Sequence, residues 1–232
     1  MSSLHHVQRI VTALSKEFAI KDLGPLHFFL GIEVTYFKGD IHLNQSKYAT
    51  ELLKKTDMEM AKAINTPLAQ NHGLHEEKGS QVDASAYRSI VGSLHRSFMQ
   101  APTAEHFQAI KRILRYVKGT LQLGLRMITQ SPLRLYGFFY ADWGGCATTR
   151  RSTTGYSIYL GANCISLASN KQNTVARPST EAEYRALASA TAEITWITYI
   201  LRDIGVTLTS APILFCVNLS ALYMFLNPVP TC

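Results

Sequence analysis

The sequence predicts an α/β protein in which helices and strands alternate along 232 residues. Three observations support this fold class. Hydrophobic residues make up 47% of the chain and charged residues 17%, which is enough apolar material for a folded core. Segments with helical spacing alternate with short β-branched and aromatic segments, and Gly- and Pro-containing turns separate them. A chain of this length forms one large domain or two small ones.

The first segment, residues 1–64, predicts a helix, a hairpin and a second helix. Apolar residues spaced by three and four predict the first helix: Leu4, Val7, Val11, Leu14 and Phe18. After the break at Gly24-Pro25, the aromatic and β-branched residues 27–36 predict one strand. A turn at Gly39-Asp40 and a short return strand at 41–43 complete the hairpin. Residues 45–56 then predict a helix.

Residues 65–83 are polar, contain Pro67, Gly73 and Gly79, and are the best linker candidate. The following segment, 84–132, predicts a basic helical connection with helices near 84–100 and 103–118. In the second helix the apolar stripe consists of Phe107, Ile110, Leu114, Val117 and Leu121.

The last segment, residues 133–232, predicts a sheet covered by a long helix. Three strands, at 135–141, 155–160 and 164–168, would form an antiparallel meander. A long helix over 179–204 follows, then a fourth strand at 213–216 and a partial helix at 220–226. Because the fourth strand follows a helical crossover, the order β-β-β-α-β-α predicts a mixed sheet.

The net charge of +7 is concentrated in the middle of the chain. Residues 88–132 contain seven basic residues and a single acidic one, Glu105. Three of these basic residues, Lys111, Arg115 and Lys118, form an edge beside the apolar stripe of the second helix, with Arg112 nearby. Such a concentration predicts a polyanionic partner such as nucleic acid. A solvated helix face is the open alternative.

Composition also bears on membranes and redox state. No apolar run approaches the roughly 18 to 20 residues needed to span a bilayer. The N-terminus lacks a hydrophobic signal stretch, which argues against secretion and predicts an intracellular protein, cytoplasmic or nuclear. The cysteines are scattered, so we expect ordinary small hydrophobes in a reducing compartment: Cys146, Cys164, Cys216 and Cys232.

Two carboxylates are candidates for chemistry. Asp142 lies at the end of a predicted apolar strand, just before the two glycines Gly144-Gly145. Either a metal ligand or a turn-capping residue would fit this position. Glu183 extends the predicted buried face of the long helix, which consists of Leu187, Ala190, Ile194, Ile197, Leu201 and Ile204. A carboxylate on a buried face needs a partner, and a metal ion supplies one. A capping box between Thr180 and Glu183 is the alternative, whereas Glu181 should face solvent.

At this point several ordered motifs become recognisable along essentially the whole chain. They are the residues 21–24, 29–34, 87–92, 112–120, 141–143 and 151–156, and above all 179–187, which read Ser-Thr-Glu-Ala-Glu-Tyr-Arg-Ala-Leu. Together they resemble the Pol polyprotein of copia-type LTR retrotransposons. The resemblance implies the tail of a reverse transcriptase, a connecting segment, and a ribonuclease H-like domain with a mixed α/β sheet.

The resemblance also implies a reaction. Asp142 matches the first catalytic aspartate of the family's ribonuclease H, and Glu183 matches its helix glutamate. The family hydrolyses the RNA strand of an RNA–DNA hybrid with Mg²⁺ or Mn²⁺ held by carboxylates. Arg150 and Arg151, just after the Asp142 turn, would then meet a phosphate backbone; a solvated surface pair is the alternative. The upstream polymerase part of the same polyprotein is a further expected partner.

The chain departs from the family pattern in several places. The family's fourth strand ends in Cys-Asp-Asn with a metal-binding aspartate, but Val217 occupies that position here. A later acidic segment is missing, and a Thr-Arg-Pro-Asp stretch expected between Leu94 and Phe98 is absent. Leu167 stands where the family usually has Trp. No Tyr-Val-Asp-Asp stretch is present, which excludes polymerisation by this segment.

These departures leave three hypotheses. The chain is an active ribonuclease H with the reverse-transcriptase connection attached, or a truncated remnant that contacts nucleic acid without catalysis, or a host-adopted interaction module. We expect the family's fold with impaired or lost activity, because Asp142 and Glu183 are the two that remain of four expected acids.

Overall fold

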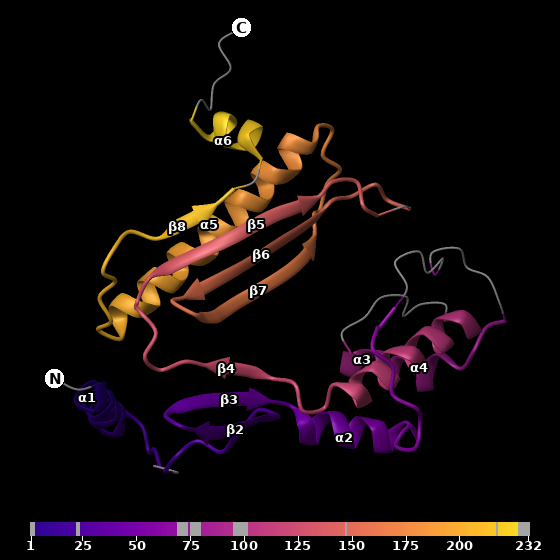
Figure 1. Ribbon diagram of the computed structural model, residues 1–232, viewed down its shortest axis with the longest axis horizontal. Helices are drawn as coiled ribbons and strands as arrows, with labels where there is room; N and C mark the ends of the chain where they lie inside the picture. Colours follow the sequence, from indigo (N-terminus) through magenta and orange to yellow (C-terminus); the bar gives the residue numbers. More distant parts are fainter. Residues whose placement is uncertain are drawn as a thin grey trace, which may run out of the picture. The chain divides into compact units, whose positions relative to one another are not determined.

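The computed structural model describes residues 3–21, 24–68, 74, 80–94, 102–146, 148–216 and 218–226. Its contacts divide the chain into two compact units, Leu26–Arg126 and Met1–Pro25 together with Met127–Cys232. Each contains its own four-stranded sheet, shown with its helices in Figure 1. The α/β class is confirmed, while the segment boundaries drawn from composition, at 64, 83 and 132, stay predictions.

The Leu26–Arg126 unit has the sheet order β1-β2-β3-β4. Its strands are β1 (Phe28–Phe29), β2 (Ile32–Phe37), β3 (Asp40–Asn44) and β4 (Leu125–Met127), and its helices are α2 (Ser46–Lys55), α3 (Ala84–Leu94) and α4 (Ala104–Gly119). The core joins helices from either side of residues 65–83 and consists of Leu52, Leu53, Tyr87, Ile110 and Leu114.

The single strand predicted at 27–36 is wrong, because the segment folds back on itself. Leu30 and Gly31 have φ values of 48° and 80° and form a tight turn between β1 and β2. Glycine reaches this left-handed conformation at no steric cost, whereas leucine reaches it at a cost of about 1 kcal/mol. The aromatic residues Phe28 and Phe29 are 51% and 58% exposed, so their hydrophobicity did not indicate burial.

Strand β4 was not predicted, since three residues carry too little periodicity. The chain enters it through Gly124, where a Cβ atom would lie 2.2 Å from the carbonyl oxygen of Leu43. Only glycine therefore allows this approach to β3. The exposed Arg126 then places both Nε and Nη2 on Asp40 Oδ2, at 2.9 and 2.7 Å.

Helix α4 begins with a capping box made by Thr103 and His106, where Thr103 N–H donates to His106 Nδ1 at 3.0 Å. The buried Ile110 and Leu114 confirm the predicted apolar stripe. Helix α3 ends at Leu94, and the remainder of the helix predicted to residue 100 lies outside the described residues.

The other unit contains α1 (Ser3–Glu17), the four strands of a second sheet, and the helices α5 (Ser179–Asp203) and α6 (Leu219–Leu226). The strands are β5 (Leu135–Asp142), β6 (Thr153–Leu160), β7 (Asn163–Lys171) and β8 (Ile213–Phe215), in the order β7-β6-β5-β8. β8 pairs parallel to β5, while the other pairs are antiparallel. The predicted mixed sheet is confirmed.

Helix α5 covers one face of this sheet (Figure 1). Alternate residues of β5 face it, so Leu135 and Phe139 are buried while Phe138 and Tyr140 are about half exposed. The buried face of α5 consists of Ala182, Ala186, Ala190, Ile194, Ile197 and Leu201. The predicted stripe is thus right in the second half of the helix. Nearer the start, fully buried alanines replace Leu187, and Ile204 follows the helix end with 44% exposure.

Within the described residues, no helix combines the length and the apolar character that crossing a membrane requires.

Replacing Ile158 by alanine tests the core of the β5–β8 sheet. Ile158 is 0% exposed and packs in one cluster with Leu135 and Ile194. We expect Ile158→Ala to lower the free energy of unfolding by about 2–5 kcal/mol in urea denaturation, because it removes buried methylenes and leaves a cavity. Leu167→Ala is the matched control: Leu167 is 78% exposed, so its change should stay within about 0.5 kcal/mol. Equal losses would contradict this core.

Candidate carboxylate site

Asp142 is the last residue of β5 and pairs with Thr153 of β6, and its side chain is exposed. The chain turns directly after it. A Cβ atom at Gly145 would lie 1.8 Å from Asp142 Oδ2, so a side chain at position 145 would require the Asp142 carboxylate to move. The turn amide of Gly144 donates instead to Ser152 Oγ, at 3.1 Å. Ser152 therefore performs the turn-capping role that was the alternative for Asp142.

Glu183 lies in the second turn of α5 and is partly buried. Its Oε2 accepts the backbone N–H of Ala141 at 3.0 Å. The capping box between Thr180 and Glu183, which was the alternative for this carboxylate, does not form: Pro178 is the N-cap residue and makes no side-chain capping bond. The Glu183 carboxylate bonds to the neighbouring strand instead.

This contact has a topological reason. β8 pairs with β5 only from Tyr136 to Phe138, so the edge of β5 beyond Phe138 has no β8 partner. A part-buried amide without an acceptor costs up to about 1–3 kcal/mol, and a carboxylate is a strong acceptor. Glu183 thus satisfies the strand edge where β8 has ended.

The structure brings the two predicted carboxylates to the same end of β5. Glu183 accepts the amide of Ala141, the residue immediately before Asp142. Figure 1 shows the start of α5 near the end of β5. The chemistry open to this pair is the binding of a hard divalent cation, which prefers carboxylate oxygen and completes its shell with water. Among the described residues, no three His, Cys, Asp or Glu side chains gather closely enough to hold a metal. Val217, at the expected third position, lies outside the described residues.

The Glu181 side chain is 33% exposed, and it supports the start of α5. Its Oε2 accepts the backbone N–H of Arg177 at 3.1 Å, and its Oε1 pairs with Arg185. The hydrogen bond from Arg177, followed by that from Arg185, lowers the pKa of Glu181 below its ordinary value. Glu181 is therefore the acidic residue that stabilises the N-terminus of α5.

The basic edge of α4 makes intramolecular contacts that the sequence did not indicate. Arg115 Nε donates to the carbonyl oxygen of Lys62 at 2.7 Å, and Arg112 Nη2 donates to Thr66 Oγ1 at 2.8 Å. Lys118 Nζ donates to the carbonyl oxygen of Glu59. These side chains hold residues 59–66 along α4. Lys111 lies over the ring of Phe107, with Nζ 5.0 Å from its centroid, and remains exposed.

Arg150 and Arg151 lie in the loop between β5 and β6 and are exposed. Arg150 has a φ of 53°, and its amide donates to the carbonyl oxygen of Cys146 at 2.7 Å. A Cβ atom at Gly144 would lie 3.0 Å from Arg150 Nη2, so this guanidinium covers the turn after Asp142.

Cys146, in the same loop, is not the ordinary small hydrophobe expected from the sequence. Hydrogen bonds from the side chain and backbone of Thr149, and then from Lys171, lower its pKa to about 6. Lys171 Nζ lies 3.1 Å from the sulfur. In the sequence, the local signal for this lowered pKa is the pair of threonines shortly after Cys146. The contact with Lys171 is tertiary and has no local signal.

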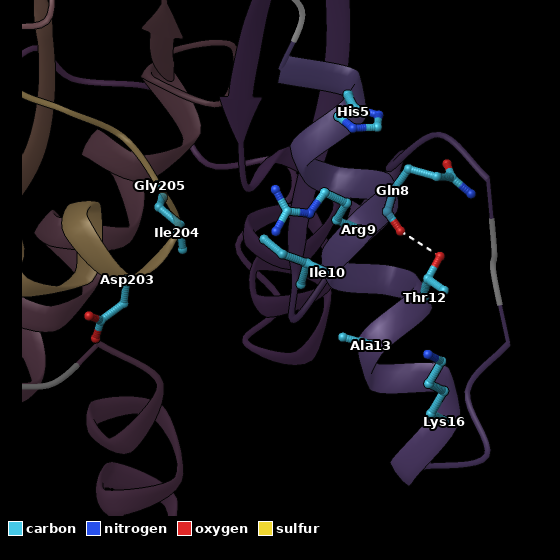
Figure 2. A pocket seen from close by; sticks show the side chains of 10 residues that line it. All are labelled: His5, Gln8, Arg9, Ile10, Thr12, Ala13, Lys16, Asp203, Ile204 and Gly205. Carbon is cyan, nitrogen blue, oxygen red and sulfur yellow. Dashed lines mark hydrogen bonds between the residues drawn. The ribbon is translucent and has the colours of Figure 1, made fainter.

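Two hollows lie elsewhere in this unit. One, of about 640 Å³, is lined by α1 residues including His5 and Arg9 and by Asp203 to Gly205 at the end of α5 (Figure 2). The other, of about 530 Å³, lies among α5, β8 and α6, with Phe139, Ile194 and Leu222 in its walls. Neither contains a predicted site residue.

Comparison with known proteins extends these observations. The family model of the reverse transcriptase (RNA-dependent DNA polymerase) matches residues 2–70. The retrovirus-related Pol polyproteins from transposons RE1 and RE2 of Arabidopsis thaliana are 41% and 38% identical to the chain over 93% and 96% of its length. The chain spans 16% of the length of each.

An uncharacterised mitochondrial protein of Arabidopsis thaliana is 41% identical over 81% of the chain and 85% of its own length. No solved structure matches. The chain therefore belongs to the copia-type retrotransposon Pol polyprotein family and includes part of its reverse transcriptase region.

Proposed function

We propose that the chain is a degenerate reverse transcriptase and ribonuclease H segment of a Pol polyprotein, with impaired or lost hydrolysis of RNA in RNA–DNA hybrids. The observation that carries this proposal is the hydrogen bond from the Ala141 amide to Glu183 Oε2, which brings Glu183 to the end of β5, where Asp142 is the last residue. The sheet around them, in which β8 follows a helical crossover and pairs parallel to β5, supports a ribonuclease H-like fold.

The residues present fit part of a metal site. Asp142 is exposed and supplies a carboxylate, while Glu183 has one oxygen bonded to Ala141 and a second oxygen for which the described residues supply no hydrogen bond. Magnesium binds through one or two carboxylates and retains several waters, so these two residues would hold a single ion. In this reaction class the metal lowers the pKa of water and stabilises the leaving oxygen.

The site lacks what a second ion requires. Valine at position 217 has no oxygen ligand, and it places an apolar group where the family has a charge. Removing one ligand carboxylate removes several kcal/mol of electrostatic stabilisation of the transition state. Asp142 and Glu183 could then still bind and orient one cation. Without the third carboxylate, the site would not balance the charge that develops in the transition state.

A cleavage assay tests the enzymatic part of the proposal. With a labelled RNA–DNA hybrid and Mg²⁺ or Mn²⁺, we expect the chain to cleave weakly or not at all. Val217→Asp should raise the rate by about 100-fold or more if it restores a ligand. Adding Asp142→Asn to that variant should abolish the gain. Robust metal-dependent cleavage by the unaltered chain, abolished by Asp142→Asn alone, would overturn the proposal of impaired activity.

A pair of substitutions at Glu183 separates its structural role from its charge. Glu183→Gln keeps an oxygen acceptor for the Ala141 amide, so stability in urea should change little. Glu183→Ala leaves that amide unsatisfied and should cost about 1–3 kcal/mol. Both variants lose the charge, so both should lose any rise in Tm that Mg²⁺ produces. A Glu183→Gln protein as unstable as Glu183→Ala would show that the hydrogen bond is not what holds this contact.

The proposed partner is an RNA–DNA hybrid, bound in part by the basic residues of α4 and of the loop between β5 and β6. The intramolecular contacts divide the α4 residues into two groups. Lys111 is exposed and bonds to no backbone carbonyl in the described structure, whereas Arg115 and Lys118 hold residues 59–66. We therefore assign phosphate contact first to Lys111 and the exposed Arg150 and Arg151.

Affinity measured against salt tests this assignment. The affinity for a hybrid should fall steeply as salt rises, and Lys111→Ala should reduce the slope of log affinity against log salt by about 1. Lys54→Ala on α2 makes the same charge change outside the basic edge of α4 and should leave the slope nearly unaltered. Arg115→Ala should mainly lower stability in urea. A flat salt response would remove the basic segment from the proposal.

A further inference from the structure

The loop that follows Asp142 places two reactive side chains in contact. Cys146 Sγ lies 3.1 Å from Lys171 Nζ, and the two residues come from the loop between β5 and β6 and from the last position of β7. Backbone contacts fix both ends of this pair. Cys146 exchanges hydrogen bonds with Arg151 and Arg150, and Lys171 is paired with Thr153 in the sheet.

The direction of the hydrogen bond distinguishes Cys146 from the other described cysteines. Cys164 and Cys216 donate to the carbonyl oxygens of Ser166 and Asn218, and a carbonyl accepts but cannot donate, so these thiols keep their protons. The sulfur of Cys146 accepts from an ammonium group instead. This arrangement favours the thiolate, which is the nucleophilic form of cysteine.

Both groups are also accessible. Lys171 is exposed, and Cys146 is half-buried at the surface of the loop. A small oxidant can therefore reach the sulfur, while the nitrogen already lies within hydrogen-bond distance of it. Oxidised cysteine sulfur condenses with neighbouring nitrogen nucleophiles when they are held this close.

We propose that peroxide oxidation joins Cys146 and Lys171 through a covalent sulfur–nitrogen bond. In the first step the Cys146 thiolate attacks one oxygen of hydrogen peroxide, the O–O bond breaks, and sulfenic acid and hydroxide form. The hydroxide takes a proton from the Lys171 ammonium and becomes water. The free amine then attacks the sulfur, the S–O bond breaks, and the departing hydroxide leaves as water with a second proton from nitrogen. The sulfur is oxidised by two electrons and the peroxide is reduced to two waters.

The bond would act on the end of the sheet that contains Asp142. Asp142, Thr153 and Lys171 lie side by side on adjacent strands, in the registers of β5 with β6 and of β6 with β7. The cross-link would remove the charge of Lys171 and tie the loop after Asp142 to β7. It does not depend on the proposed hydrolysis, because neither Cys146 nor Lys171 has a role in that reaction.

Mass spectrometry of the full chain tests the proposal. After treatment with hydrogen peroxide we expect a mass about 2 Da lower, and a tryptic map with one peptide joining Cys146 to an uncleaved Lys171. Dithiothreitol should reverse both. Lys171→Arg keeps a positive donor but supplies a far weaker nucleophile, so oxidation should stop at sulfenic acid, about 16 Da heavier and trapped by dimedone.

Cys146→Ser should show neither product, and urea denaturation should show that both variants fold as the unaltered chain does. The proposal is overturned if the 2 Da loss maps to a disulfide, or if it persists in Lys171→Arg. Equal dimedone trapping in Lys171→Arg and the unaltered chain would overturn it as well.

Discussion

The hydrogen bond from the Ala141 amide to the Glu183 carboxylate is the contact on which the arrangement around Asp142 depends. β8 is only three residues long and leaves the end of β5 without a partner on that side. The Glu183 carboxylate accepts the amide at this unpaired strand edge and fixes the start of α5 against the sheet. One interaction therefore satisfies this strand edge and places Glu183 against Ala141, the residue before Asp142.

Packing allows this contact to form. The first half of α5 presents Ala182, Ala186 and Ala190 to the sheet, each 0% exposed, so the helix approaches the strands closely there. In the second half, larger residues such as Ile194 and Leu201 fill the space against Leu135 and Ile158. The small residues at one end are what let a short glutamate side chain reach the backbone of β5.

Periodicity predicted the elements that bury a regular apolar face. β5 to β8 and α5 were found within a few residues because alternation and helical spacing both report burial. The strand at 27–36 was misjudged because its aromatic residues are exposed and its turn depends on Leu30 adopting a positive φ. The capping box failed because a local pattern competes with a tertiary acceptor, and spacing alone does not show which partner Glu183 binds.

The sequence by itself determined the family, the order of helices and strands, and the choice of Asp142 and Glu183 as candidate carboxylates, since these follow from motifs and from patterns within single segments. Only the tertiary structure decided the partners. It joined Glu183 to Ala141, Arg115 to the carbonyl oxygen of Lys62, and Cys146 to Lys171. Each of these pairs is separated by 25 residues or more in the chain. Their contact depends on which strand edges and turns the fold brings together. The periodicity within a single segment cannot predict which segments will meet.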